Sequence, residues 1–152
     1  TQDFNLNTKT VEAHYHSYEE GMAAAKAQGK PVLIDFTGFG CVNCRKMEAA
    51  VWTDPTVADM LNNQYVLISL YVDDKTPLAE PVEVSLNGQQ QTLRTVGDKW
   101  SYLQASKFGA NAQPYYIAID NDGRPLNHAY GFKEDVAAYI DYLQQGLNTY
   151  RR

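Results

Sequence analysis

The distribution of apolar residues predicts a strand, a helix and a second strand in the first part of the chain. Residues 11–16 alternate Val, Ala and Tyr with Glu and His, which is typical of a weak, half-buried strand. Ser17, with Glu20 three positions later, matches a capping box, so we expect a helix over residues 18–28. Residues 31–36 are mostly apolar, which predicts a central strand buried on both faces.

The middle of the chain predicts further helices and a further strand, followed by a segment that breaks this alternation. Apolar side chains at helical spacing predict a helix over residues 44–52 and a second, short one over residues 54–61. A buried strand is expected over residues 65–72. Within residues 77–97, two alternating segments flank an Asn-Gly pair, the strongest short-range signal for a hairpin. We therefore expect an inserted β-hairpin there.

The last part of the chain returns to alternating helices and strands. Asp98 is the expected N-cap of a helix that ends near residue 108, and residues 115–120 form the next predicted strand. A short strand near residues 128–130 and a helix over residues 133–147 complete the pattern. The order β-α-β-α-β, followed by α-β-β-α, predicts an α/β fold.

The composition and length of the chain are consistent with a single folded domain. Of its 152 residues, 44% are hydrophobic and 20% are charged, an ordinary globular balance. We expect residues 11–152 to form one domain and residues 1–10, which are polar and lack a period, to be a linker or a flexible arm. The chain begins with Thr1 instead of Met, as expected of a processed protein or of a segment from a longer one.

Charge and hydropathy narrow the range of partners. The net charge is -5, and the basic residues form no cluster apart from Arg151 and Arg152, so a nucleic-acid partner is disfavoured. The longest apolar stretches are far shorter than the ~18 residues that a membrane-spanning helix requires. We therefore look for the chemistry of the chain in its cysteines.

The two cysteines, Cys41 and Cys44, form a Cys-x-x-Cys motif directly after the strand expected over residues 31–36. At the start of a helix, free backbone N–H groups and the positive end of the dipole favour the thiolate of Cys41, which makes it a nucleophile. Cys44, one turn later, can attack the mixed disulfide that Cys41 forms with a partner. The pattern predicts thiol–disulfide exchange.

Two other interpretations of the cysteine pair stay open. A structural zinc site needs about four ligands. The remaining ligands would come from His14, His16 or His128, none of which has a ligand-like spacing to the pair. Two buried, inert thiols are the other alternative. The position of the pair between a buried strand and a helix start favours redox chemistry.

Residues 30–36, which precede the motif, resemble the strand before the active site of thioredoxins. The octet Cys-Val-Asn-Cys-Arg-Lys-Met-Glu over residues 41–48, followed by Val-Trp-Thr-Asp-Pro over residues 51–55, is similar to the C-terminal periplasmic domain of the DsbD family of transmembrane disulfide reductases. The resemblance covers about residues 17–147. It implies a thioredoxin fold, with a central mixed β-sheet flanked by helices.

The resemblance also implies roles for individual residues. Cys41 would be the attacking thiolate, Cys44 the resolving thiol, and Pro114 a cis-proline facing the pair; a trans proline at a strand edge is the alternative. Gln113 would offer its backbone to an extended segment of a partner. Apart from the resemblance, the position of Tyr115 beside Pro114 predicts that it touches a partner; packing between helix and sheet is the alternative. The cysteine disulfide would be the redox group, and we expect neither a further cofactor nor a metal.

Two carboxylates are candidates for moving the proton of Cys44. Asp35 lies in the middle of the apolar strand, where burial of a carboxylate raises its pKa and makes it a useful proton acceptor. Glu48 follows Cys44 by four residues and lies on the same helix face. By resemblance it matches a second acid of the DsbD-type domain that tunes or shuttles this proton; a solvated helix carboxylate is the alternative.

The chain departs from the family pattern around the cysteines. Gly40 stands where an aromatic residue usually precedes the first cysteine, and Phe39 supplies the nearest ring, so we expect these two residues to dock partners differently. Between the cysteines, Val42 and Asn43 include no His or Pro of the kind found in strongly oxidising relatives. We therefore interpret the protein as a reductant.

The resemblance implies a protein-disulfide reductase that faces the periplasm, as the soluble domain of an inner-membrane protein. It would receive electrons from a membrane-embedded dithiol, in the same parent chain or in another protein. It would pass them to thioredoxin-like proteins or to cytochrome c maturation proteins. A free-standing thioredoxin-like reductase or isomerase is one alternative, and a redox-inactive binding module with the same fold is another.

Overall fold

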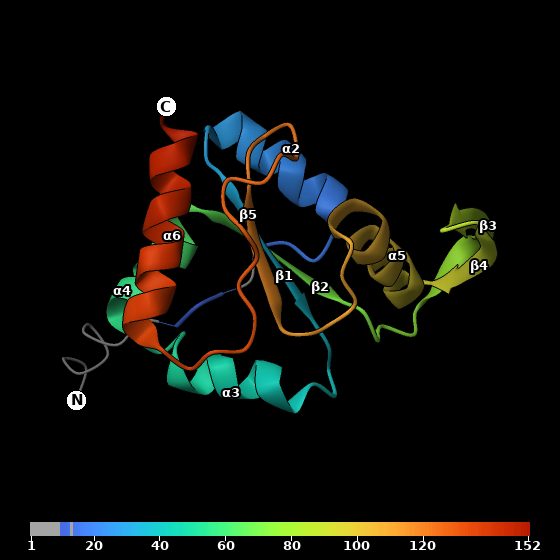
Figure 1. The fold of residues 1–152 in the computed structure, drawn as a ribbon, viewed down its shortest axis with the longest axis horizontal. Helices are drawn as coiled ribbons and strands as arrows, with labels where there is room; N and C mark the ends of the chain where they lie inside the picture. The colour runs from blue at the N-terminus through green and yellow to red at the C-terminus, as the bar shows by residue number, and fades with distance from the viewer. Residues whose placement is uncertain (1–9, 13) are drawn as a thin grey trace.

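A central sheet of three strands organises the computed structural model, which describes residues 10–12 and 14–152. Its strands are β1 (Val32–Thr37), β2 (Val66–Tyr71) and β5 (Tyr115–Ile119), in the order β2-β1-β5. Strand β1 runs parallel to β2 and antiparallel to β5, so the sheet is mixed (Figure 1). The predicted linker over residues 1–10 lies almost wholly outside the described residues.

Helices cover both faces of this sheet (Figure 1). Alternate residues of β1 point to opposite faces, so Ile34 and Phe36 belong to one buried cluster and Leu33 to the other. Helices α2 (Tyr18–Gln28) and α5 (Val96–Phe108) pack on the first face. The second face carries α3 (Val42–Ala50), α4 (Pro55–Asp59), the π-helix η1 (Met60–Gln64) and α6 (Val136–Tyr150). The predicted thioredoxin-type α/β architecture is confirmed.

Local capping signals explain where several helices begin. The Ser17 side chain accepts a hydrogen bond from the backbone N–H of Glu20, as predicted for the start of α2. For α5 the expected N-cap, Asp98, is wrong by three residues. Thr95 is the N-cap, and Asp98 completes a capping box with it by accepting from the Thr95 backbone N–H.

Other predicted boundaries also need correction. The helical segment expected over residues 54–61 continues as a π-helix to Gln64. The last helix is displaced by three residues at each end relative to the prediction over 133–147, because Asp135 caps it and it continues to Tyr150.

The two outer strands of the predicted sheet are much shorter than expected. In place of a strand over residues 11–16, the described residues make one parallel bridge between Tyr15 and Ile68, because the chain turns at once into the cap of α2. The strand near residues 128–130 is likewise one antiparallel bridge, between Tyr116 and Tyr130, before the chain leaves for the cap of α6.

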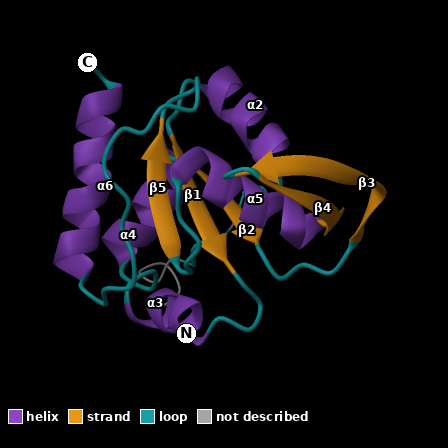
Figure 2. Ribbon diagram, turned by 45° about the vertical axis from the view of Figure 1, so that its right-hand side comes forward, coloured by secondary structure: helices purple, strands orange, loops and turns teal. Residues whose placement is uncertain are grey.

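The predicted hairpin is confirmed and forms a sheet of its own. Strand β3 (Pro77–Leu86) pairs with β4 (Gln89–Thr95) around Asn87 and Gly88. These two turn residues have φ values of 52° and 80°, as a two-residue hairpin turn with positive φ requires. The hairpin packs against α5 and projects beyond it, away from α3, in both views (Figures 1 and 2).

Candidate active site

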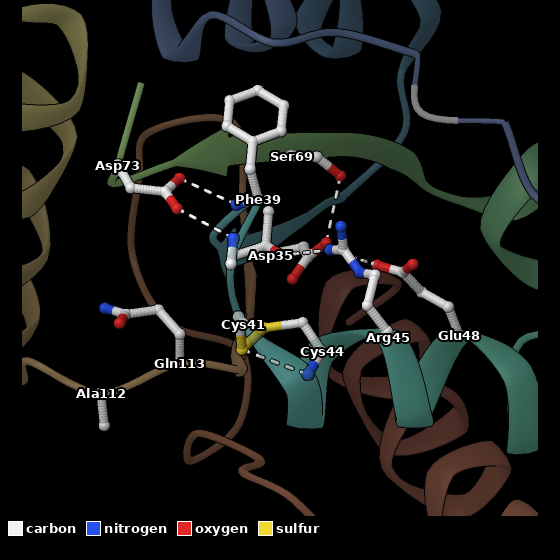
Figure 3. Close-up of a disulfide and its surroundings, with 12 residues drawn as sticks. Asp35, Phe39, Cys41, Cys44, Arg45, Glu48, Ser69, Asp73, Ala112 and Gln113 are labelled. Carbon is white, nitrogen blue, oxygen red and sulfur yellow. Dashed lines mark hydrogen bonds and ion pairs between the residues drawn. A yellow bond between two sulfur atoms is a disulfide. The ribbon is translucent and has the colours of Figure 1, made fainter. Parts of the chain in front are cut away.

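The cysteine motif lies where β1 ends and α3 begins, as the sequence predicts. Cys41 is the N-cap of α3 and is bonded to Cys44 in a disulfide, with their Cα atoms 5.3 Å apart (Figure 3). The Cys41 sulfur accepts a hydrogen bond from the Cys44 backbone N–H at 3.2 Å. Cys41 is partly exposed, whereas Cys44 is 1% exposed. A partner can therefore reach Cys41 but not Cys44.

This placement suits Cys41 for nucleophilic attack once the disulfide is reduced. A helix N-terminus carries unpaired N–H groups and a partial positive charge, both of which stabilise a thiolate. The Cys44 N–H already points at the Cys41 sulfur, so the donor that a thiolate needs is in place. The geometry supports attack by Cys41 and closure of the ring by Cys44.

Asp73, just after β2, holds the loop that leads to Cys41. Its two carboxylate oxygens accept hydrogen bonds from the backbone N–H groups of Phe39, at 2.8 Å, and Gly40, at 3.0 Å. Partial burial would raise the pKa of Asp73, but these donors outweigh it and lower that pKa. Asp73 was not predicted from the sequence, although an acid directly after a buried strand was an available signal.

Phe39 is exposed but held in a defined orientation. Its ring stacks on that of Tyr71, with 4.1 Å between centroids and 19° between planes. The residue is 62% exposed, and its ring points away from the disulfide, on the side of β2 (Figure 3). Its predicted contact with partners stays a prediction, and any such contact would be made beside the cysteines.

Asp35 is buried beneath the motif, at 2% exposure, on the same face of β1 as Leu33 and therefore toward α3. Its Oδ2 accepts a hydrogen bond from the Ser69 hydroxyl at 3.2 Å, and its Oδ1 has no partner among the described residues. Burial raises the pKa of Asp35 to about 7; the nearby Glu48 carboxylate adds to this, and Ser69 and Arg45 oppose it.

Glu48 lies near Asp35 but is more exposed than Asp35. Arg45 donates from Nη2 to Glu48 Oε2 at 2.9 Å and to the Thr37 hydroxyl at 3.0 Å. The Glu48 side chain is 33% exposed, so it is partly buried and partly in contact with solvent. Burial raises the pKa of Glu48 although the Arg45 guanidinium favours its charged form. Sequence reasoning gave Arg45 no role, although it follows Cys44 directly.

The segment before β5 completes the surroundings of the disulfide. The Gln113–Pro114 peptide bond is cis, as the resemblance predicted. Gln113 lies beside the disulfide, with its side-chain amide donating to Gln104 at 2.9 Å, and Gln104 in turn donates to the Ala112 carbonyl (Figure 3). Within the described part of the chain, the backbone N–H and C=O of Gln113 make no hydrogen bond.

Tyr115 is not brought to the disulfide. It pairs with Phe36 across β1 and β5 and packs against Phe36 and Phe108, on the face that α5 covers. Asp35 and the cysteines lie toward the opposite face. The predicted partner contact of Tyr115 stays a prediction, without support from this placement.

The histidines of the zinc alternative are engaged elsewhere. His16 donates from Nδ1 to the Ser69 carbonyl, His14 accepts from the Leu67 N–H, and the His128 ring stacks on Tyr142. Over residues 10–12 and 14–152, no three His, Cys, Asp or Glu side chains are grouped so that they could hold a metal ion.

Fold and site together define a protein with a thioredoxin-type dithiol–disulfide centre. Residues 13–93 match the thioredoxin-like family, and the chain therefore belongs to that family.

Its relatives include thiol:disulfide interchange proteins named DsbD. That of Pseudoalteromonas atlantica is 31% identical over 109 residues, which cover 63% of this chain and 18% of the relative. That of Vibrio vulnificus is 27% identical over 154 residues, covering 96% of this chain and 22% of the relative. The chain thus spans about a fifth of the length of these relatives.

Solved structures share the fold. A DsbH oxidoreductase has a TM-score of 0.64 and 17% identity, covering 94% of this chain and 88% of that one. The DsbD C-terminal domain of Neisseria meningitidis in its reduced form has a TM-score of 0.57 and 18% identity, covering 87% of this chain and 98% of that one.

Fold, disulfide and relatives together support a thiol:disulfide oxidoreductase. None of the described helices is long and apolar enough to cross a membrane.

Proposed function

We propose that this chain is a protein-disulfide reductase that transfers electrons by dithiol–disulfide exchange. One observation carries the proposal: a partly exposed Cys41 caps α3 and is bonded to a buried Cys44, with the buried carboxyl group of Asp35 beneath the motif. An exposed nucleophile, a protected resolving thiol and a proton acceptor are the groups that this exchange requires.

The reaction uses the two thiols in order. The thiolate of Cys41 attacks one sulfur of the partner's disulfide, which forms a mixed disulfide and releases the partner's other sulfur as a thiolate. Cys44 loses its proton to Asp35 and attacks the Cys41 sulfur. The Cys41–Cys44 disulfide closes, and the partner leaves with both sulfurs reduced. Two electrons have then passed from the dithiol to the partner.

Asp35 suits the proton step because its pKa is near neutrality. At a pKa of about 7, the carboxylate can take a proton from a thiol and return it to water at neutral pH. Glu48 and Arg45 are near enough to this buried group to influence its pKa, and both side chains are partly exposed. We assign them to the exchange of that proton with water.

The partner binds as an extended segment beside Pro114. The unpaired backbone N–H and C=O of Gln113 support this, because a partner segment can pair with them as an added strand would. Thioredoxin-like proteins, including proteins of cytochrome c maturation, are the proposed recipients.

The DsbD relatives support the proposed electron source, a membrane-embedded dithiol in the same parent chain or in another protein. In this proposal residues 11–152 form a thioredoxin-like domain in the periplasm, as the soluble domain of an inner-membrane protein.

Substitution of each cysteine tests the proposed order of attack. We expect Cys41→Ser to lower the rate of reduction of a disulfide-bonded substrate protein by at least about a hundredfold, because the nucleophile is lost. Cys44→Ser should instead accumulate a mixed disulfide between Cys41 and the substrate, visible by non-reducing electrophoresis. A Cys41→Ser protein that reduces the substrate at the normal rate would refute the proposal.

A further inference from the structure

A pocket lies beside the loop that leads to Cys41. It has a volume of about 270 Å³ and is lined by His16, Phe39, Tyr71, Asp74 and Trp100. Pockets for whole small-molecule ligands usually measure about 300 to 1,000 Å³. This pocket is therefore of a size to take one long side chain.

Aromatic rings form most of its wall, and their orientations are fixed. Phe39 stacks on Tyr71, and the Tyr71 and His16 rings lie 5.8 Å apart. The hydrogen bond from His16 Nδ1 to the Ser69 carbonyl orients the His16 ring. Trp100 is 4% exposed and belongs to the core beneath. Because these rings are already in place, an occupant would bind without the entropic cost of ordering them.

Asp74, one of the residues that line the pocket, carries a carboxylate. Asp74 accepts a hydrogen bond at Oδ1 from the Thr76 N–H, and no other hydrogen bond reaches its carboxylate from the described residues. Its backbone is held on both sides, by the Gly97 N–H and by the Tyr71 carbonyl. Oδ2 is thus left for an occupant that can donate a hydrogen bond.

The charges around the pocket favour a cation as that occupant. Aromatic faces attract cations, and the attraction is added to that of a carboxylate. Lys99 already lies over one of these rings, with its Nζ 4.8 Å from the centroid of Trp100. That lysine is engaged in an ion pair with Glu19 at 3.2 Å, and the charge of the neighbouring Lys75 acts on Asp73.

We propose that this pocket binds a lysine or arginine side chain of the partner protein, an inference that rests on the proposed function. Phe39 precedes Cys41 by two residues, and its ring points away from the disulfide (Figure 3). The pocket therefore adjoins the place where a partner's disulfide is attacked. An extended chain advances about 3.3 Å per residue, so we test cationic residues two to four positions from the cysteine that Cys41 attacks. The pocket thereby selects partners by the residue that flanks their disulfide.

Peptide kinetics test this selectivity. The probes are peptides of one sequence with a single cysteine capped as a disulfide with 2-mercaptoethanol, and with Arg, Gln or Glu two, three or four positions away. The reduced protein should react with the best Arg peptide roughly three to ten times faster than with its Gln counterpart, and most slowly with Glu. Equal rates for Arg, Gln and Glu at all three positions would overturn the inference.

Variants distinguish the effect of the pocket on the Arg preference from the effect of the protein's general negative charge. Asp74→Asn and Phe39→Leu should each reduce the Arg preference to less than about twofold. Asp122→Asn removes the same charge from an exposed turn after Ile119, at the opposite end of the sheet from Thr37, and should keep the full preference. A preference that falls equally in Asp122→Asn and Asp74→Asn would overturn the inference.

A binding measurement separates this inference from the proposed function. In an NMR titration of the disulfide form, N-acetyl-arginine amide should shift the indole N–H of Trp100 and the amide of Phe39, and should shift neither in Asp74→Asn. Absence of these shifts in the unmodified protein would refute the pocket assignment, whatever the cysteines do. Failure of the reduced protein to react with any capped peptide would instead refute the proposed function.

Discussion

Asp35 and Asp73 differ in how far their environments can be predicted from the sequence. The burial of Asp35 follows from its apolar neighbours in β1, so its raised pKa is predictable from the chain alone. Asp73 is different, because its partners, Phe39 and Gly40, are more than thirty residues away in the chain. Arg45 is missed although Thr37 is only eight residues away, because their contact exists only after β1 and α3 have packed.

The raised pKa of Asp35 has a consequence for stability. Between the ordinary value of 3.8 and about 7, the folded protein holds a proton on Asp35 that the unfolded chain has released. The free energy of unfolding therefore falls as the pH rises through this range, and Asp35→Asn removes that loss. We expect Asp35→Asn to stabilise the disulfide form by about 2 to 3 kcal/mol more at pH 8 than at pH 5.

Urea unfolding at the two pH values measures this difference. Asp122→Asn is the matched control, because it removes a carboxylate from an exposed turn. A stability change in Asp35→Asn that does not depend on pH would show that the Asp35 carboxyl group titrates normally in the folded protein.

Helices, strands and the hairpin were predictable as far as their signals are local. The cap of α2 and the Asn87–Gly88 turn depend on residues a few positions apart, and both are confirmed. The cap of α5 was misplaced because Thr95 and Asp98 are both good capping residues, and the choice depends on where β4 ends. The two predicted outer strands are single bridges in the structure. The neighbouring helix caps, and not the alternation of apolar and polar residues, determine where the chain turns.

The contact between α5 and the end of β2 depends on a glycine. A Cβ atom at Gly97 would come closer to backbone atoms of Val72 and Asp74 than real Cβ atoms do, and backbone cannot move aside cheaply. Although Ala is the better helix former, we expect Gly97→Ala to destabilise the protein by roughly 1 to 3 kcal/mol. Gly131→Ala, which meets no atom within 4 Å, should change stability by less than about 0.5 kcal/mol.

Thermal or urea unfolding of both glycine variants decides the point. Equal stability of Gly97→Ala and Gly131→Ala would contradict the close approach of α5 to β2 that helps to hold Asp74.

At the scale of the whole molecule, successive side chains of β1 point to opposite faces of the sheet, and the two faces serve different purposes. Its residues toward α2 and α5 are purely apolar, whereas Asp35 faces α3 and the disulfide. The residue pattern predicted an α/β fold with Cys41 and Cys44 between a strand and a helix, and the resemblance predicted the thioredoxin fold and the cis-Pro114 bond. The sequence did not predict that Tyr115 faces α5, because a residue's neighbour in sequence points to the opposite face of a strand.

The most direct test of the central claim, that the centre acts as a reductant, is the reduction potential of the Cys41–Cys44 pair. It is measured by equilibrating the protein with defined thiol buffers and quantifying the reduced fraction. Because Val42 and Asn43 offer nothing that would strongly stabilise the reduced form, we predict a potential of roughly -200 to -270 mV, in the range of glutaredoxins and thioredoxin. A potential near about -120 mV, that of a strong oxidant, would contradict the direction of electron flow proposed here.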